Sequence, residues 1–257
     1  IEYDSAGRLA GLTEERGNKL VFEYDPAGRL VGLTDPLSNP TEQIYDAAGQ
    51  QTSATDALGR TTTYEYDDVG RLIRTRFPDG SSIETAYDAA GNVISETDEL
   101  GLQTQFEYDV LNRLTAVVDE LGSRTEYAYD EAGNTVSQTD ARGNTTTFEY
   151  DGNGRRTKVR LPLGQVSTVE YDAVGNVVSS TDFNGDTVTF DYDNRNRMTA
   201  RNFPDGTKVE FSYMGNGLVH KITDQRGVTT YEYDAMDRVI SVEDPNGQVL
   251  SYTYDAA

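Results

Sequence analysis

The 257-residue sequence contains no cysteine and no tryptophan, a single histidine and few basic residues. Without cysteine there is no disulfide, no thiolate zinc site and no cysteine nucleophile. Lys and Arg number 22 against 44 Asp and Glu, which gives a formal net charge of −22. Because a basic patch supplies most of the affinity of proteins for nucleic acid, this charge argues strongly against nucleic-acid binding. It argues equally against docking onto anionic lipid.

Long hydrophobic runs are also missing. No apolar segment approaches the ~18 residues of a membrane-spanning helix, so we expect no membrane insertion, and no signal peptide is visible. Hydrophobic residues make up 36% of the chain, which is low for a thick core. No segment carries a long helical pattern. The chain starts at Ile1 and stops at Ala257, both inside a repeat, so we expect a piece of a longer protein.

What the sequence does contain is a repeat of 21 residues. One slot holds 13 of the 17 tyrosines at steps of 21 residues, with a single step of 20: Tyr3, Tyr24, Tyr45, Tyr66, Tyr87, Tyr108, Tyr129, Tyr150, Tyr171, Tyr192, Tyr213, Tyr233 and Tyr254. Twelve copies of this length are typical of an array with one supersecondary unit per repeat. The short step precedes Tyr233, and we place the missing residue within residues 228–230.

Each repeat is predicted to be one β-hairpin. Aromatic residues two apart, as in Phe22-Glu23-Tyr24, indicate a strand with one aromatic face, and a shorter β-branched segment such as 176–180 follows. The segments are separated by two turns of the form Asp-x-x-Gly, the pattern of a type I turn that ends in a left-handed residue. These turns hold 20 of the 24 glycines, and Asn112 and Asn196 replace two others, because Asn tolerates left-handed geometry.

Residues 1–257 are therefore expected to form one domain. This domain is an all-β tandem array of about twelve 21-residue β-hairpins in one long, coiled antiparallel sheet, either a spiral or a shell wall, because open sheets of more than about ten strands curl. Leu30, Leu72 and equivalent residues are expected between successive tyrosines, as a Tyr–Leu–Tyr ladder. The residue after the first turn alternates between Arg and Asn from Arg71 to Arg197. This 42-residue period indicates neighbouring hairpins that differ in tilt or in contacts.

The string Tyr66-Asp67-x-x-Gly70-Arg71-Leu72, with the string Thr-Asp-x-x-Gly ten residues after the tyrosine in other copies, resembles the YD repeat, also called the RHS repeat. The resemblance covers essentially the whole chain. It implies an array that winds into a hollow β-shell. Bacterial members are large secreted proteins, among them polymorphic toxins, insecticidal toxin complexes and wall-associated proteins, in which the shell encloses a toxic C-terminal domain. In animal teneurins a related shell serves cell–cell adhesion.

The resemblance implies a structural shell segment of a large secreted or cell-surface bacterial protein, which encapsulates or scaffolds a cargo such as a toxin domain. The alternative is an extracellular surface or filament module for adhesion, cell contact or carbohydrate binding. The expected partners are the flanking repeats and either an enclosed protein cargo or neighbouring copies that pair through strand edges. Glycans are the partners in the alternative function.

We expect no catalytic, cofactor-binding or metal site, and no enzyme activity. His220 lies on a predicted strand without partners for a triad or a metal site. The resemblance gives the string Asp244-Pro245-x-Gly247 a second meaning, because a similar signature lies near the autoproteolytic core of shell-type members. Here the string occupies an ordinary second turn, and the next residues return to strand. The aspartates recur with the turns, so they are interpreted as turn caps rather than a catalytic pair or calcium ligands.

Overall fold

The computed structural model describes residues 1–15 and 17–255, and the chain divides into two compact units, Ile1–Glu126 and Tyr127–Ala257. The first unit holds β1 (Glu2–Tyr3), β2 (Leu9–Thr13), β3 (Lys19–Tyr24), β4 (Leu30–Thr34), β5 (Pro40–Tyr45), β6 (Gln51–Thr55), β7 (Thr61–Tyr66), β8 (Leu72–Arg76), β9 (Ser82–Tyr87), β10 (Val93–Thr97), β11 (Gln103–Tyr108) and β12 (Leu114–Val118). The boundary falls within β13 (Arg124–Tyr129).

The second unit holds β14 (Thr135–Thr139), β15 (Thr145–Tyr150), β16 (Arg156–Arg160), β17 (Val166–Tyr171), β18 (Val177–Thr181), β19 (Thr187–Tyr192), β20 (Met198–Asn202), β21 (Lys208–Tyr213), β22 (Val219–Asp224), β23 (Gly227–Tyr233), β24 (Val239–Glu243) and β25 (Val249–Ser251). No helix of the length and apolar character needed to cross a membrane occurs among the described residues.

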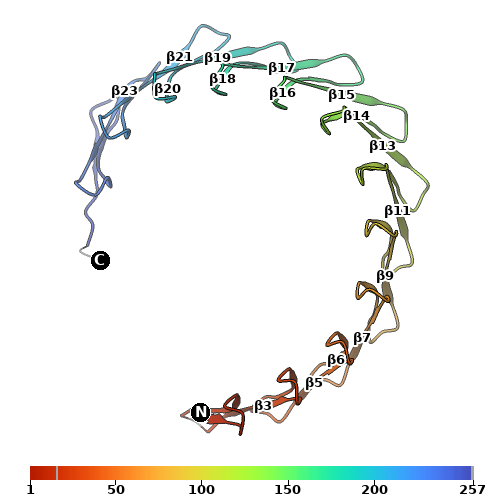
Figure 1. Cartoon of the computed structure of the whole chain (residues 1–257). Coiled ribbons are helices and arrows are strands. Elements are labelled where there is room, and N and C mark those ends of the chain that lie inside the picture. Colours follow the sequence, from red (N-terminus) through yellow and green to blue (C-terminus); the bar gives the residue numbers. More distant parts are fainter. Residues whose placement is uncertain (16, 256–257) are drawn as a thin grey trace. The chain divides into compact units, whose positions relative to one another are not determined.

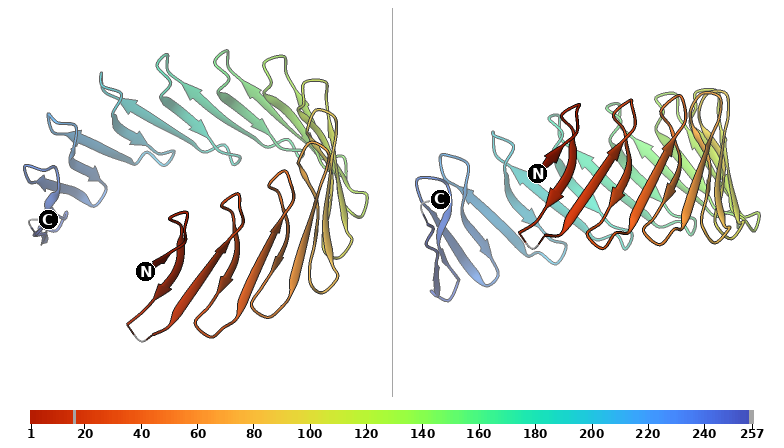
Figure 2. Two further views of the ribbon diagram at one scale, coloured as in Figure 1. Left: turned by 60° about the horizontal axis from the view of Figure 1, so that its bottom comes forward. Right: turned by 90° about the horizontal axis from the view of Figure 1, so that it is seen from below.

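The prediction of an all-β hairpin array is confirmed. Successive strands from β1 to β13 and from β14 to β25 pair antiparallel, as β6, β7 and β8 do. The hairpins follow one another along the sheet (Figure 1), and the turns alternate between its two opposite edges (Figure 2). Each unit, taken by itself, has a curved sheet.

The turns have the predicted geometry. In the first turn of the second repeat, the Gly28 N–H donates to the Asp25 carbonyl at 2.9 Å, and the Asp25 N–H donates to the Arg29 carbonyl at 3.0 Å. The 20 turn glycines all have positive φ. The only other described residues with positive φ are Ser38, Asn112, Asn196 and Asp237, which replace the turn glycine in their repeats.

A β-bulge in the hairpins closed by first turns was not predicted. In β7–β8, Tyr66 pairs with Leu72 and Glu65 pairs with Arg74, so Ile73 is the extra residue. Ten further first-turn hairpins show the same shift in register. Because a bulge increases the local right-handed twist, its repetition is a physical source of the curvature within each unit.

The predicted position of the missing residue is wrong. In β22–β23, Lys221 pairs with Thr230 and Asp224 pairs with Gly227, so the strand keeps its register and the loss shortens the second turn. The physical reason is the two-residue period of a strand. A deletion within β23 would move every following side chain to the opposite face.

The sheet has almost no buried core. Only Gly11 and Ala116 are buried among the described residues. In β7, Tyr64 and Tyr66 are half-buried, whereas Glu65 between them is exposed. We call the side that carries the Phe and Tyr residues of the odd-numbered strands the aromatic face and the other side the charged face. Each repeat is therefore stabilised by its neighbours in the same layer.

Candidate functional site

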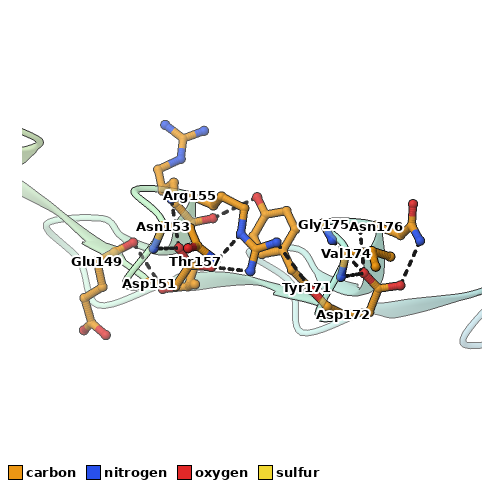
Figure 3. Close-up of polar contacts among 11 residues, drawn as sticks. Glu149, Asp151, Asn153, Arg155, Thr157, Tyr171, Asp172, Val174, Gly175 and Asn176 are labelled. Carbon is orange, nitrogen blue, oxygen red and sulfur yellow. Dashed lines mark hydrogen bonds and ion pairs between the residues drawn. The ribbon is translucent and has the colours of Figure 1, made fainter. Parts of the chain in front are cut away.

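One set of side-chain contacts that joins one repeat to the next lies at the first turns, and Figure 3 shows an example. Asp151 begins the first turn of the eighth repeat, and its Oδ1 accepts the backbone N–H of Arg155 at 3.0 Å. The Arg155 Nε donates to Asp151 Oδ2 at 2.6 Å. The aspartate therefore caps the turn, as predicted, and also fixes the direction of the arginine side chain.

The far end of the same arginine reaches the following repeat. The Arg155 guanidinium carbon lies 4.4 Å from the centroid of the Tyr171 ring, and Nη1 donates to the Asp172 carbonyl at 3.4 Å (Figure 3). A cation over an exposed aromatic ring contributes about 0.5–1 kcal/mol. We call this set of contacts, from the turn aspartate through the arginine to the next tyrosine and carbonyl, an arginine clasp.

Arginine clasps recur along both units. The guanidinium lies 4.4–4.8 Å from the next tyrosine ring and Nη1 lies 3.1–3.4 Å from the next carbonyl oxygen at Arg8, Arg29, Arg71, Arg155 and Arg197. Arg238 stacks on Tyr254 at 4.4 Å. The sequence showed the arginine slot, but the ring and the carbonyl that it contacts belong to the following repeat and were not foreseen as its partners.

The clasp lies where the strand ladder stops. In β16–β17, the hairpin closed by a second turn, the ladder consists of three residue pairs, from Arg160–Val166 to Lys158–Thr168. Beyond these pairs the hairpin has an open end, at which Arg155 and Tyr171 stand. The Tyr171 hydroxyl donates to the Arg156 carbonyl at 3.2 Å. Side chains therefore close the end of the hairpin that backbone pairing leaves open.

The strand pairing places residues in the order of the predicted Tyr–Leu–Tyr ladder, and a hydrogen bond joins successive repeats there. Leu72 pairs with Tyr66 of its own repeat and accepts the Tyr87 hydroxyl of the next repeat at 3.2 Å. The same donation to the carbonyl of the filler slot is made by Tyr66, Tyr87, Tyr150, Tyr171, Tyr192, Tyr213, Tyr233 and Tyr254.

We expect Tyr192→Phe to lower the free energy of unfolding by about 0.5–1.5 kcal/mol, the net value of one hydrogen bond. Its hydroxyl donates to the Val177 carbonyl at 2.9 Å. Tyr108→Phe is the matched control, because the Tyr108 hydroxyl makes no hydrogen bond with the described residues. Urea denaturation followed by circular dichroism measures both, and equal losses in the two variants would contradict the prediction.

In the alternate repeats an amide occupies the arginine slot. Gln50 donates to the Gly70 carbonyl at 2.9 Å, and Asn92 donates to Asn112 Oδ1 at 2.9 Å. Asn176 donates to Asn196 Oδ1 at 3.3 Å. An amide carries no charge, so these residues make no cation–π contact. We call these contacts amide junctions, and they show that the 42-residue period reflects a difference in contacts.

The slot residue lies close to the first turn of the next repeat. A Cβ atom would lie 3.2 Å from Arg29 Nη1 at Gly49 and 3.2 Å from Gln50 Nε2 at Gly70, which is tight, and 3.5 Å from Arg155 Nη1 at Gly175, which is an ordinary contact. Asn112 and Asn196, which do carry a Cβ atom in this turn position, follow Asn92 and Asn176 and accept their amide hydrogens. Each clasp described above is thus followed by glycine in the next first turn, whereas asparagine occurs there only after an amide.

The turn carboxylates are held in their charged form. Hydrogen bonds from the Arg197 side chain, followed by its backbone N–H, lower the pKa of Asp193 from 3.8 to about 2. The pKa is also lowered at Asp4, Asp25, Asp67, Asp109 and Asp234, where the largest cause is the backbone N–H of the arginine four residues later. The folded state therefore binds protons at these sites less readily than the unfolded chain.

These lowered pKa values predict acid-induced loss of stability. The stabilisation is complete above the ordinary aspartate pKa of 3.8 and is lost as the pH falls toward about 2. The urea midpoint is expected to fall over this interval. Measurement in about 1 M salt, where the Debye length is about 3 Å, screens the general repulsion of the acidic chain. A midpoint that rises steadily with acid would contradict the assignment.

The residues singled out in the sequence as candidates for chemistry lie in ordinary elements. His220 is in β22. The Asp244 turn has the hydrogen bonds of the other second turns, with Gly247 N–H to Asp244 O at 3.0 Å, and β25 follows it. No group of three or more His, Asp or Glu residues arranged to hold a metal ion occurs in the described ranges.

Two family models match the chain. The teneurin YD-shell matches residues 79–257, which is more than half of the sequence, and the RHS repeat matches residues 3–39 and 45–82. No curated protein is significantly similar. The two family matches together cover nearly the whole array.

Solved structures show the same fold. The crystal structure of TcdB2-TccC3-TEV has a TM-score of 0.56 at 17% identity, over 93% of this chain and 16% of that chain. The structure of TcdB2-TccC3-Cdc42 has a TM-score of 0.57 at 17% identity, over 94% of this chain and 15% of that chain. A Photorhabdus luminescens Tc holotoxin pore with a substituted TccC3 has a TM-score of 0.55 at 16% identity, over 90% of this chain and 16% of that chain. The chain thus spans about a sixth of the length of the structures it resembles.

Proposed function

The chain belongs to the YD-shell family of RHS-repeat proteins, and we propose from this membership that it is a section of the wall of a larger shell that encloses a protein cargo. The observation that carries the proposal is the single-layer sheet. Only Gly11 and Ala116 are buried among the described residues, and each repeat is held by clasps, amide junctions and tyrosine hydroxyls to the repeats beside it. This is the construction of a wall rather than of a globular core.

The length of the related chains supports a place in a longer protein, because this chain matches about a sixth of them. In the proposal, flanking repeats continue residues 1–257 at both ends as one array. The cargo, for example a toxin domain, comes from the same longer protein. We further propose secretion or display on the surface of a bacterium. The role is structural, and we assign no catalytic step to the chain.

Limited proteolysis of the longer protein tests the proposal. A domain that follows the array is expected to resist trypsin while the array is folded and to be cleaved once urea unfolds the array. A strand deletion that breaks the sheet, such as the one considered in the Discussion, should expose the domain without urea. Cleavage at the same rate in the folded and unfolded protein would rule out enclosure.

Glycan binding by the isolated chain distinguishes a shell wall from an adhesion module. Micromolar binding of the isolated chain to a glycan array would favour a surface module for adhesion or carbohydrate binding. Electron micrographs of the longer protein should then show the array as an open or filamentous surface element. Closed particles are the result expected for a shell.

A further inference from the structure

The two kinds of junction alternate along the chain. Amide junctions follow the repeats that carry Gln50, Asn92 and Asn176, whereas arginine clasps follow those that carry Arg71 and Arg197. Asn134 also occupies the slot with an amide, which donates to Asp130 of its own turn. Contacts of the two kinds therefore alternate from the third to the fifth repeat in the first unit and from the eighth to the tenth in the second.

We propose that the array opens in modules of two repeats, with the amide junctions as the seams at which neighbouring modules separate first. In a linear array each repeat contacts only its neighbours, so the stability of each interface determines where the array opens. Local opening occurs at the interface with the smallest free energy, well before global unfolding. A module between two seams then consists of two repeats and is held together internally by an arginine clasp.

The second unit offers a direct comparison of the two junctions. The hairpins β16–β17 and β18–β19 each have three ladder pairs, and a tyrosine hydroxyl closes the open end of each. They differ in the slot residue. Arg155 stacks on Tyr171 and reaches the Asp172 carbonyl, whereas Asn176 makes one hydrogen bond to Asn196 at 3.3 Å.

Two contacts favour β18–β19. The Thr181 and Thr187 hydroxyls lie 2.8 Å apart, but beside the second turn that already closes this hairpin. At the open end, the Tyr192 hydroxyl bond is 2.9 Å long against 3.2 Å for Tyr171. Against this small difference, Arg155 adds a ring contact and a hydrogen bond where Asn176 adds one hydrogen bond, so we expect the slot residue to decide which hairpin opens first.

The first unit contains a seam without a tyrosine hydrogen bond among the described residues. In β10–β11 the open end is held by the Asn92–Asn112 hydrogen bond, and the Tyr108 hydroxyl has no hydrogen bond with the described residues. In the preceding hairpin, β8–β9, Arg71 stacks on Tyr87 at 4.5 Å and donates to the Asp88 carbonyl at 3.2 Å. We expect β10–β11 to open before β8–β9.

Hydrogen–deuterium exchange of the whole chain, read by mass spectrometry, tests the proposal. The ladder amides of β10–β11 and β18–β19 are expected to exchange about tenfold faster than those of β8–β9 and β16–β17. Arg155→Asn should raise exchange in β16–β17 by about tenfold. The matched control is Arg160→Asn, since Arg160 is exposed at the opposite end of β16, and it should leave exchange unchanged.

The reverse substitution, from an amide junction to an arginine clasp, provides an independent variant. Asn176→Arg together with Asn196→Gly recreates the arginine and glycine combination of a clasp, and it should slow exchange in β18–β19 about tenfold. This variant decides the question even where Arg155→Asn fails to fold. Uniform exchange along each unit, or equal effects of Arg155→Asn and Arg160→Asn, would overturn the proposal. Neither result bears on the enclosure of a cargo.

Discussion

Deletion of Thr189 is expected to destabilise the protein far more than deletion of Asp186, which lies three residues earlier. Thr189 is within β19, where it pairs with Ser179 and Asn202. Its removal moves Phe190 to the charged face, because the strand period is two residues. Full burial of an aromatic side chain stabilises by about 1.5–3 kcal/mol, and Phe190 and Tyr192 are each half-buried. Their lost packing and the lost Tyr192 hydrogen bond together lower the free energy of unfolding by about 3 kcal/mol.

Deletion of Asp186 is the control supplied by the chain itself. It shortens the second turn by one residue, as in the eleventh repeat, where Asp224 pairs with Gly227 and β23 keeps its register. We expect a change in unfolding free energy of about 0.5 kcal/mol or less, typical of an exposed site. Urea denaturation and exchange in β19 measure both variants. Equal stability of the two would show that register does not hold this sheet.

Gly175→Val is expected to lower the free energy of unfolding by about 2–3 kcal/mol. Gly175 has a φ of +103°, a conformation that costs a β-branched residue about 1–3 kcal/mol. A Cβ atom would already be in contact with Arg155 Nη1 at 3.5 Å, so we expect the two methyl groups of valine beyond it to compete with the guanidinium for space over Tyr171. Two independent losses therefore add at this turn.

The control for this substitution is Gly154→Asn. Gly154 also has positive φ, but it follows the amide residue Asn134, as Asn112 follows Asn92. Asn tolerates the left-handed conformation, and no clasp is displaced. We expect a loss of about 0.5 kcal/mol or less in thermal or urea unfolding. A loss at Gly154→Asn as large as that at Gly175→Val would contradict the link between the arginine and the following glycine.

Turns and strands were predictable because their determinants are local. Gly and Asn adopt the left-handed backbone conformation with little strain. Residues of these types at the right spacing, such as Gly28 and Asn112, therefore mark turns. Two aromatics separated by one residue mark a strand face. The 42-residue period was also visible. What it means depends on the neighbour of each arginine, and Tyr171 comes near Arg155 only after β16 and β17 have paired.

Other features have no local signal of their own. The bulge at Ile73 follows from the offset between two registers, Tyr66 with Leu72 and Glu65 with Arg74, and no residue type marks it. The missing residue of the eleventh repeat was misplaced because aligning the Asp-x-x-Gly pattern puts the gap after Gly227. The strand pairing puts the loss between Asp224 and Gly227 instead. Only the strand pairing shows which residues belong to the ladder.

The pairing of each slot residue with the turn that follows it also limits how such a gene can lengthen. Duplication of the tenth repeat alone would place Arg197 directly before a second Asn196 turn, whose Oδ1 would lose the amide donor that Asn176 supplies. Duplication of the ninth and tenth repeats together keeps an amide before each Asn196 turn and an arginine before each Gly175 turn. Arrays of this kind are expected to grow and shrink by pairs of repeats.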